Sequence, residues 1–363
     1  MLFAALTFAT CVVVLSALLP MSHCGHWTIR GLDFPRLQLA MTGALVCAVC
    51  IVGLDLYEIK SALLLALNIV ATGYQLWWIA PYTPLWPLQV KLSSSSNNSN
   101  PLRILSSNVL MPNKNAEALI RIINDCVPDI IVTLESDQWW EDQLVTIEKQ
   151  YPYSIKCPKD NLYGMHLYSK YPLTHGSIDY LIDDEIPSIK AFITPPDSDA
   201  IRLHFLHPTP PSPTESENSS DRDSELILIA KELSNYTEPV IVTGDLNDVA
   251  WSKTTHLFRH LSGLKDPRIG RGMFNTFHAG YWFLRWPLDH LFHSDHFELK
   301  RMERLKLKGS DHFSLFTELC LKKPRHGQKT PDTQPEVLTD DEKSLMRQRR
   351  QEQQAKATNN RNG

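Results

Sequence analysis

The sequence predicts a layered α/β domain that follows a group of membrane-spanning helices. Three observations support this prediction. The first 90 residues contain three long uncharged apolar runs, residues 102–321 alternate between strand-like and helix-like stretches, and residues after 321 are polar and poor in core-forming side chains. Alternating helices and strands favour a layered α/β architecture. The overall composition, 43% hydrophobic and 21% charged, excludes a chain that is disordered throughout.

Residues 1–90 are predicted to form a membrane anchor of three transmembrane helices, at about 2–19, 37–54 and 61–80. Each run is uncharged and close to the ~20 residues that cross ~30 Å of hydrocarbon. Trp77, Trp78, Tyr82 and Trp86 at the end of the third run are typical of the aromatic belt at a membrane surface. Three such runs with short connections favour membrane spans over buried core helices.

Two polar segments flank the central domain. Residues 91–101 form a Ser/Asn-rich stretch closed by a proline, which predicts a flexible linker. Residues 322–363 are rich in Lys, Arg, Gln and Asn, which predicts a disordered polar tail. A short helix is possible within this tail at 339–354, where Thr339 and Glu342 have the spacing of a capping box.

The central segment, 102–321, is long enough for one substantial core. Apolar and β-branched runs predict its strands, and longer periodic stretches predict its helices. The strands are expected at 102–107, 129–134, 200–206, 239–243, 288–292 and 313–319, and the helices at 116–127 and 224–233. The proline-rich stretch 208–223 is expected to be a surface loop.

Charge and cysteine content exclude several kinds of protein. Residues 101–321 carry a net charge of about −9, which argues against a domain that grips nucleic acid mainly through phosphates. The same carboxylates are compatible with a metal site. The seven cysteines have no spacing typical of a disulfide framework or a zinc knuckle in the central segment. Walker A, GxSxG and paired GxGxxG motifs are absent from the sequence.

Polar residues recur where the predicted strands begin or end. They are Asn108, Glu135, His207, Asp245, Asn247, Asp289, Asp311 and His312. In layered α/β folds, functional sites form at strand ends, where loops converge on a rigid sheet. Oxygen ligands of this type suit Mg²⁺ or Mn²⁺ better than zinc. Each residue alone is more often a turn former or a helix cap, but so many in one pattern predict a site.

Six short motifs carry these residues. They are Ser-Asn-Val (107–109), Leu-Glu (134–135), His-Pro (207–208), Gly-Asp-Leu-Asn (244–247), Leu-Asp-His-Leu-Phe (288–292) and Ser-Asp-His-Phe (310–313). Together they resemble the endonuclease/exonuclease/phosphatase superfamily, in the family's order, and the segment 164–173 is similar to that family in its usual place. The resemblance implies a four-layer α/β sandwich of two packed sheets flanked by helices.

The resemblance also implies a metal site and its ligands. Glu135 would be the main metal carboxylate, with Asn108 and Asp311 close by. One or two Mg²⁺ or Mn²⁺ ions would neutralise charge that builds up on a phosphoryl oxygen.

The resemblance implies catalytic roles for five further residues. His312 would contact the scissile phosphate or activate water, and Asp289 would hydrogen-bond to it and fix its tautomer. Asp245 would orient or deprotonate the attacking water, and Asn247 would donate to the transition state. His207 would be a second phosphate ligand or the general acid. The spacing leaves open whether Asp245 or His312 is the base.

These residues predict a membrane-tethered, metal-dependent phosphoesterase that hydrolyses a phosphodiester or phosphomonoester by attack of water. Its phosphate-ester substrate could be lipid-linked, and Arg268 and Arg271 are the candidate anion contacts. The alternatives are a nuclease of the same superfamily, disfavoured by the −9 charge, and a non-catalytic membrane scaffold.

A zinc hydrolase is a third alternative, since the chain has 14 histidines. His256 and His260 have helical i, i+4 spacing, but the HExxH glutamate is absent. His290, His293 and His296 are spaced by three and have no clear ligand of another type. We interpret all of these as surface or supporting histidines.

Two arguments about membrane orientation disagree. Arg30, Arg36, Lys91 and Arg103 lie on the side of the central domain and Lys60 on the other, so the positive-inside rule favours a cytoplasmic domain. The chain resembles most closely the membrane-anchored bacterial members with three N-terminal spans. That resemblance implies the cytoplasmic membrane of a bacterium, with the catalytic domain outside. We favour the second argument, because the charge count rests on few residues.

Overall fold

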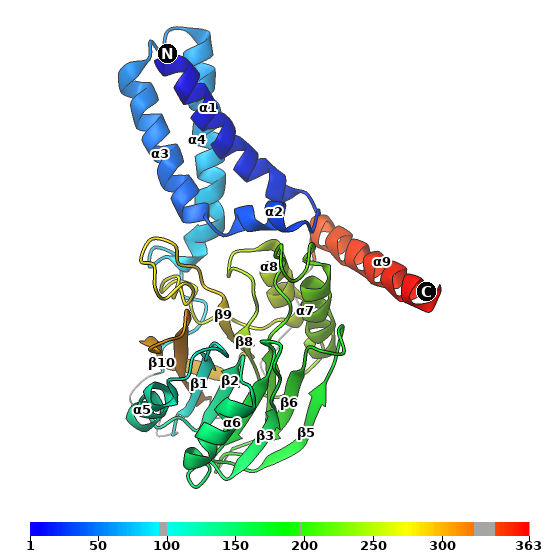
Figure 1. The fold of residues 1–363 in the computed structure, drawn as a ribbon. Helices are drawn as coiled ribbons and strands as arrows, with labels where there is room; N and C mark the ends of the chain where they lie inside the picture. The colour runs from blue at the N-terminus through cyan, green and yellow to red at the C-terminus, as the bar shows by residue number, and fades with distance from the viewer. Residues whose placement is uncertain (94–99, 197, 323–337, 363) are drawn as a thin grey trace, which may run out of the picture.

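The computed structural model describes residues 1–93, 100–196, 198–322 and 338–362 (Figure 1). Three long helices project from one end of a compact α/β body, and a C-terminal helix leaves the body at the side of α7. The long helices are α1 (Leu2–Leu18), α3 (Arg36–Gly53) and α4 (Ile59–Ile79), and the short segments between and after them are η1 (Leu19–Met21), α2 (Trp27–Arg30), η2 (Gly31–Asp33) and η3 (Ala80–Tyr82).

The N-terminal helices are long and apolar enough to cross a membrane, over Leu2–Met21, Arg36–Gly53 and Ile59–Tyr82. Close packing and polar contacts hold α3 and α4 together. A Cβ atom at Gly43 would lie 2.1 Å from Thr72 Oγ1, and Asn68 donates a hydrogen bond to Gly43 O at 2.7 Å. Small residues and interhelical hydrogen bonds are the usual means of association between membrane helices.

The body contains two mixed sheets. The six-stranded sheet has the order β10-β11-β1-β2-β4-β3, and the five-stranded sheet the order β5-β6-β7-β8-β9. The strands are β1 (Leu102–Asn108), β2 (Ile130–Leu134), β3 (Tyr153–Cys157), β4 (Met165–Ser169), β5 (Leu173–Asp179), β6 (Ser188–Ile193), β7 (Ile201–Leu206), β8 (Val240–Asp245), β9 (Asp289–His293), β10 (Phe297–Lys306) and β11 (Phe313–Leu321).

Helices cover the outer face of each sheet, so the body has the four layers that the resemblance implies. The helices α5 (Ala116–Cys126) and α6 (Gln138–Leu144), followed by η4 (Val145–Ile147), share an apolar cluster with the six-stranded sheet. The helices α7 (Ser220–Leu233) and α8 (Lys253–Ser262) share another with the five-stranded sheet.

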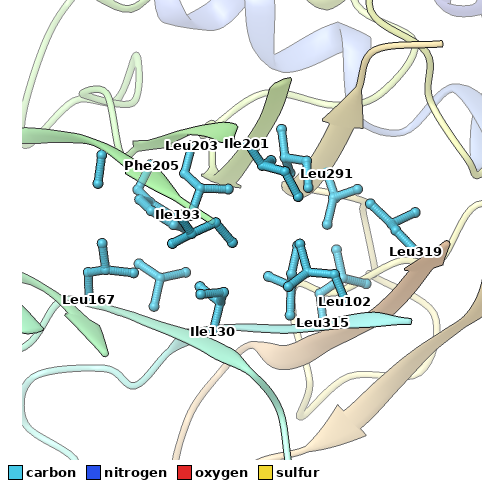
Figure 2. Close-up of a cluster of buried hydrophobic side chains, with 14 of the residues drawn as sticks. Leu102, Ile130, Leu167, Ile193, Ile201, Leu203, Phe205, Leu291, Leu315 and Leu319 are labelled. Carbon is cyan, nitrogen blue, oxygen red and sulfur yellow. The ribbon is translucent and has the colours of Figure 1, made fainter. Parts of the chain in front are cut away.

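The main core lies between the two sheets (Figure 2). Ile130 and Leu167 face it from the six-stranded sheet, and Ile193, Leu203 and Leu291 face it from the other. Strand residues alternate between faces, so the remaining residues of the same strands pack under the helices. Because both faces are buried, the central strands read as continuous apolar runs in the sequence.

Several elements were not predicted from the sequence, namely β3 to β6, β10, α6 and α8. The edge strand β10 carries alternating charges and β5 is largely exposed, which is how edge strands commonly avoid pairing with other chains. Such strands have a weak apolar signal. The loop expected at 208–223 is shorter, because α7 already begins at Ser220.

The C-terminal tail is not disordered over residues 338–362. They include the helix α9 (Asp340–Asn362), whose capping box forms: Glu342 Oε2 accepts from Thr339 N at 2.8 Å, and Glu342 N donates to Thr339 Oγ1 at 3.2 Å. Arg349 is buried and pairs with Asp223 of α7 at 2.8 Å. A charged composition predicts disorder only if the charged side chains remain solvated. Here the buried carboxylate of Asp223 pairs with one of them, Arg349. The rest of the predicted tail, 323–337, lies outside the described residues.

The predicted linker begins as part of the sheet. Ser93 N donates to Leu299 O of β10 at 2.8 Å, and Leu299 N donates to Lys91 O at 3.0 Å. Val90 belongs to the core between the sheets. Gly270 has φ +78°, and a Cβ atom there would lie 2.8 Å from the backbone of Leu88, so this stretch passes close to the domain. Residues 94–99 lie outside the described part of the chain.

The N-terminal helices pack against the α/β body and are not joined to it only by a free linker. Tyr82 donates a hydrogen bond to Ala250 O at 2.6 Å, and Trp251 Nε1 donates to Asp33 O at 2.7 Å. Ile79 lies in the same apolar cluster as Trp251. The two parts therefore share a small core of their own.

We expect the segment 85–93 to stabilise the α/β body. A fragment of residues 101–363 should unfold at a lower temperature than one of residues 85–363, by the equivalent of about 2–4 kcal/mol. The loss combines the burial of Val90 with hydrogen bonds to β10. Thermal unfolding followed by circular dichroism measures the difference. Both fragments lack the anchor, so equal melting temperatures would show that the segment contributes nothing.

Candidate active site

The strand register brings the predicted site residues to one edge of the sandwich. Parallel pairing of β1 with β2 sets Asn108 beside Leu134, so Glu135 follows at the same end. In the other sheet, Asp245 at the end of β8 lies opposite Asp289 at the start of β9. Gly244 is required here, because a Cβ atom would come within 2.0 Å of Leu206 O of β7.

Asn108 connects the two sheets at this edge. Its side chain is fully buried, and its Nδ2 donates to Glu135 Oε1 at 2.7 Å and to Asp245 Oδ2 at 3.2 Å. Its Oδ1 accepts from Leu110 N at 3.1 Å, which fixes the orientation of the amide. One amide therefore holds a carboxylate from each sheet.

Glu135 is a partly buried carboxylate in an unfavourable setting. Its backbone has φ +57°, which is rare outside glycine and clusters at functional sites. Its Oε2 is buried and has no hydrogen-bond partner among the described residues, and the same is true of Asp311 Oδ1. Burial, with the neighbouring charge of Asp245, raises the pKa of Glu135 to about 7, although Asn108 opposes the shift.

His312 lies between two carboxylates. Its Nδ1 is 2.8 Å from Asp289 Oδ2, and its Nε2 is 3.4 Å from Asp245 Oδ2. Burial alone would lower the pKa of His312, but the two carboxylates raise it to about 10. Burial would likewise raise the pKa of Asp245, yet His312 and His207 hold it below its usual value. At neutral pH the group is an imidazolium between carboxylates.

His207 and Asn247 border this group. His207 follows β7, whose Leu206 pairs with Gly244, so it lies beside the end of β8. Burial lowers the pKa of His207 to about 4, and its Nδ1 makes no hydrogen bond to any described residue. Asn247 has φ +51°, donates its backbone N–H to Asp245 Oδ1 at 2.9 Å and donates its side chain to Pro208 O at 2.9 Å.

Three supporting residues were missed by the sequence analysis. Thr276 Oγ1 accepts from Asp289 N at 3.1 Å. The ring of Phe277 lies 4.9 Å from that of His312, and the ring of Tyr163 lies 5.2 Å from that of His207. They come from loops without a motif, and only their place in the fold identifies them.

The prediction that Arg268 contacts a substrate anion is wrong. Its guanidinium is completely buried, pairs with Asp266 at 2.8 Å and lies 2.7 Å from His290 Nδ1. The partly buried guanidinium of Arg271 donates to the main-chain carbonyls of Pro267 at 2.9 Å and Val90 at 2.5 Å. Both arginines hold the loop after α8 in place.

The histidines spaced by three have structural partners. His290 Nε2 lies 2.9 Å from Asp248 O, His293 Nδ1 lies 2.8 Å from Ser294 O, and His296 Nδ1 lies 2.9 Å from Ser294 Oγ. They do not converge on a common point, as the sequence interpretation expected.

This geometry is accompanied by a family match. The profile of the endonuclease/exonuclease/phosphatase family matches residues 105–312, more than half of the chain, and the chain belongs to this family. Members of this family are hydrolases that act on phosphoester bonds, and they generally use divalent metals.

Solved structures show the same fold. Danio rerio TDP2 in complex with a single-stranded DNA product is 17% identical, with a TM-score of 0.52 over 61% of this chain and 99% of that one. The catalytic domain of human Nocturnin with bound sulfate is 17% identical, with a TM-score of 0.50 over 61% and 95%. An endonuclease/exonuclease/phosphatase from Beutenbergia cavernae is 15% identical, with a TM-score of 0.50 over 61% and 72%. No curated protein sequence matches the chain significantly.

The residues at the sheet edge fit a divalent cation. Glu135 Oε2 and Asp311 Oδ1 are buried oxygens that lack partners among the described residues, and Asn108 adjoins Glu135. Asp245, Asp289 and His312 also lie close enough together to hold an ion. In this second group the nitrogens of His312 are directed at the two carboxylates.

Glu135→Gln is expected to stabilise the metal-free protein at high pH. The pKa of Glu135 in the fold, about 7, lies above its ordinary value of 4.5, so ionisation costs stability as the pH rises through this interval. In EDTA at pH 8 the variant should gain on the order of 1–3 kcal/mol, and the gain should vanish near pH 4. Thermal unfolding of both proteins tests this. The exposed Glu117→Gln is the control, and a wild type as stable as the variant at pH 8 would contradict the assignment.

Proposed function

We propose that the protein is a membrane-tethered, divalent-metal-dependent phosphoesterase that hydrolyses a phosphodiester or phosphomonoester by attack of water. The observation that carries this proposal is the position of His312 between Asp289 and Asp245, with Asn108 linking Asp245 to Glu135. A cluster of carboxylates that a single imidazolium compensates only in part would be costly for a purely structural role.

The protonation states favour Asp245 as the residue that orients and deprotonates water. The pKa of Asp245 is lowered, so it is an acceptor at neutral pH. His312, with a pKa of about 10, is an imidazolium and therefore a donor to a phosphoryl oxygen. Asp289 holds its Nδ1 and fixes the ring. We therefore propose Asp245, and not His312, as the base.

His207 and Asn247 would bind the phosphoryl group from the five-stranded sheet. A histidine with a pKa of about 4 is neutral at pH 7, so it acts as a hydrogen-bond donor and not as a general acid before substrate binds. Asn247 is held at a positive φ by Asp245 and Pro208, which points its amide to the same edge. Mg²⁺ or Mn²⁺ held by Glu135, with Asn108 and Asp311 beside it, would supply charge neutralisation at a phosphoryl oxygen.

Asp245→Asn should reduce turnover by about 10²–10⁴-fold with little change in melting temperature, because the shape is kept while the acceptor is lost. The assay follows hydrolysis of a phospholipid, a lipid pyrophosphate, a small diester and plasmid DNA, each with Mg²⁺ and with EDTA. The exposed Asp160→Asn is the matched control. Undiminished turnover in Asp245→Asn would refute the role, and DNA as the preferred substrate would favour the nuclease alternative. Absence of turnover on every substrate would favour a scaffold.

An exposed aromatic loop supports a substrate located at the membrane surface. Tyr281, Trp282 and Phe283 are 53%, 82% and 53% exposed. The loop is tied to the anchor, since Gln38 in the first turn of α3 donates to Phe283 O at 2.8 Å. It is also close to the site, because Ala279 N donates to Asp311 O at 2.6 Å. In Figure 1 this yellow segment lies directly below the membrane helices.

We infer that these aromatic side chains enter the interfacial region of the bilayer, where Trp and Tyr are favoured. The site would then receive a phosphate ester carried by a lipid. We place the protein in the cytoplasmic membrane of a bacterium with its catalytic domain outside, on the resemblance to anchored bacterial members. A phosphatase-reporter fusion at residue 322 tests the side: activity supports the outside, and silence the inside.

Trp282→Ser together with Phe283→Ser should raise the KM for a phosphate ester embedded in vesicles by about tenfold or more, and leave hydrolysis of a soluble diester unchanged. The expected cause is the loss of apolar side-chain burial at the membrane surface, which contributes about 1.5–3 kcal/mol of binding free energy for a large side chain. Tyr153→Ser, which alters a 39%-exposed aromatic on β3, is the control. Equal losses on both substrates would place the loop in catalysis and not in membrane contact.

A further inference from the structure

A second group of metal-type ligands lies apart from the catalytic edge, between α8 and α9. His256 and His260 are one turn apart on α8, and both direct Nδ1 at the same oxygen of Glu342 on α9. His256 Nδ1 lies 3.5 Å from Glu342 Oε1, and His260 Nδ1 lies 2.8 Å from it. Three ligands from two helices thus meet at one point, although 82 residues separate His260 from Glu342 in the sequence.

The carboxylate of Glu342 is held in position for this arrangement. Its Oε2 accepts hydrogen bonds from Thr339 N at 2.8 Å and Thr339 Oγ1 at 2.9 Å. The other oxygen, Oε1, is thereby directed toward the histidines. Outer hydrogen bonds of this kind orient the ligands of metal sites.

The ligand types and spacings suit zinc. Zinc takes histidine nitrogen and carboxylate oxygen at about 2.0–2.2 Å in a tetrahedral arrangement, which sets ligand atoms roughly 3.3 Å apart. The nitrogens and oxygen here all lie within 4.8 Å of one another, and two of their separations are 2.8 and 3.5 Å. Imidazole ligands favour zinc over Mg²⁺.

The group is accessible to an ion from solution. The side chain of His256 is 42% exposed, that of His260 18% and that of Glu342 10%. A solvent-facing position also leaves room for a water as a fourth ligand.

We propose that His256, His260 and Glu342 bind one zinc ion that fastens α9 to α8. The site would be structural, because its ligands join two helices, whose Leu257 and Leu345 also lie in one apolar cluster beside α7. The ring centroids of His256 and of Trp78, at the end of α4, lie 6.0 Å apart in an edge-to-face arrangement. The ion would therefore join the C-terminal helix to the junction between the anchor and the catalytic domain.

The test measures zinc in the full-length protein in detergent. The protein is stripped with EDTA, exposed to Zn²⁺ in excess Mg²⁺, desalted and analysed for metal by mass spectrometry. Wild type and Glu135→Gln should each retain about one zinc per chain. His260→Gln and Glu342→Gln should retain at least tenfold less, and the exposed His175→Gln should behave as wild type.

Two readouts keep the result interpretable if a variant folds poorly. His256→Gln changes the most exposed ligand and should lose zinc while its circular dichroism spectrum is unchanged. Co²⁺ added to the stripped protein should give the visible absorption of a tetrahedral site in wild type and Glu135→Gln, but not in the ligand variants. A wild type that retains no zinc, or ligand variants that retain as much as wild type, would overturn the proposal and leave a hydrogen-bonded His–Glu group.

Discussion

The hydrogen bonds from the buried amide of Asn108 to Glu135 and Asp245 are the interaction on which the catalytic edge depends. The two sheets meet face to face through apolar side chains, which set no register between them. The hydrogen bonds of Asn108 at the end of β1 to a carboxylate from each sheet fix the position of the two sheets relative to each other at this edge. The carboxylates of Glu135 and Asp245, which Asn108 brings together, would repel each other if both were charged and uncompensated. The imidazolium of His312 supplies part of the compensating positive charge.

The sequence was sufficient for the central strands and for most of the site, for a shared reason. Strands buried on both faces are apolar throughout, and the polar residues that end them stand out, as with Asp245 after β8. It was insufficient where partners come from distant parts of the chain. The sequence predicts Arg268 as an anion contact, but in the fold Asp266 and His290 surround its guanidinium. The sequence likewise predicts a disordered tail where α9 forms, because it does not show that Arg349 pairs with Asp223. Ion pairs between residues far apart in the chain leave no pattern in the local sequence.

The C-terminal helix shows how charge can specify a contact that apolar packing alone would leave loose. Arg349 lies in a buried group with Asp223 and Arg222, and Asp223 also accepts from Ser219 at 2.8 Å. Buried ion pairs add little net stability against an apolar alternative, but a missing partner is costly. The arrangement therefore favours a single position of α9 on α7, and the histidines of α8 meet Glu342 only in that position.

The packing of Tyr82 and Trp251 across the junction has a consequence for kinetics. A domain on a long flexible linker samples a wide range of heights above a membrane, whereas a domain packed against its own helices keeps a constant height and tilt. For the membrane-tethered enzyme and lipid-linked substrate proposed above, encounters would be governed by lateral diffusion within the leaflet, and the relevant concentration would be molecules per unit of surface area. Diluting the bulk solution would then leave the reaction rate unchanged, and diluting the substrate lipid with inert lipid would slow it.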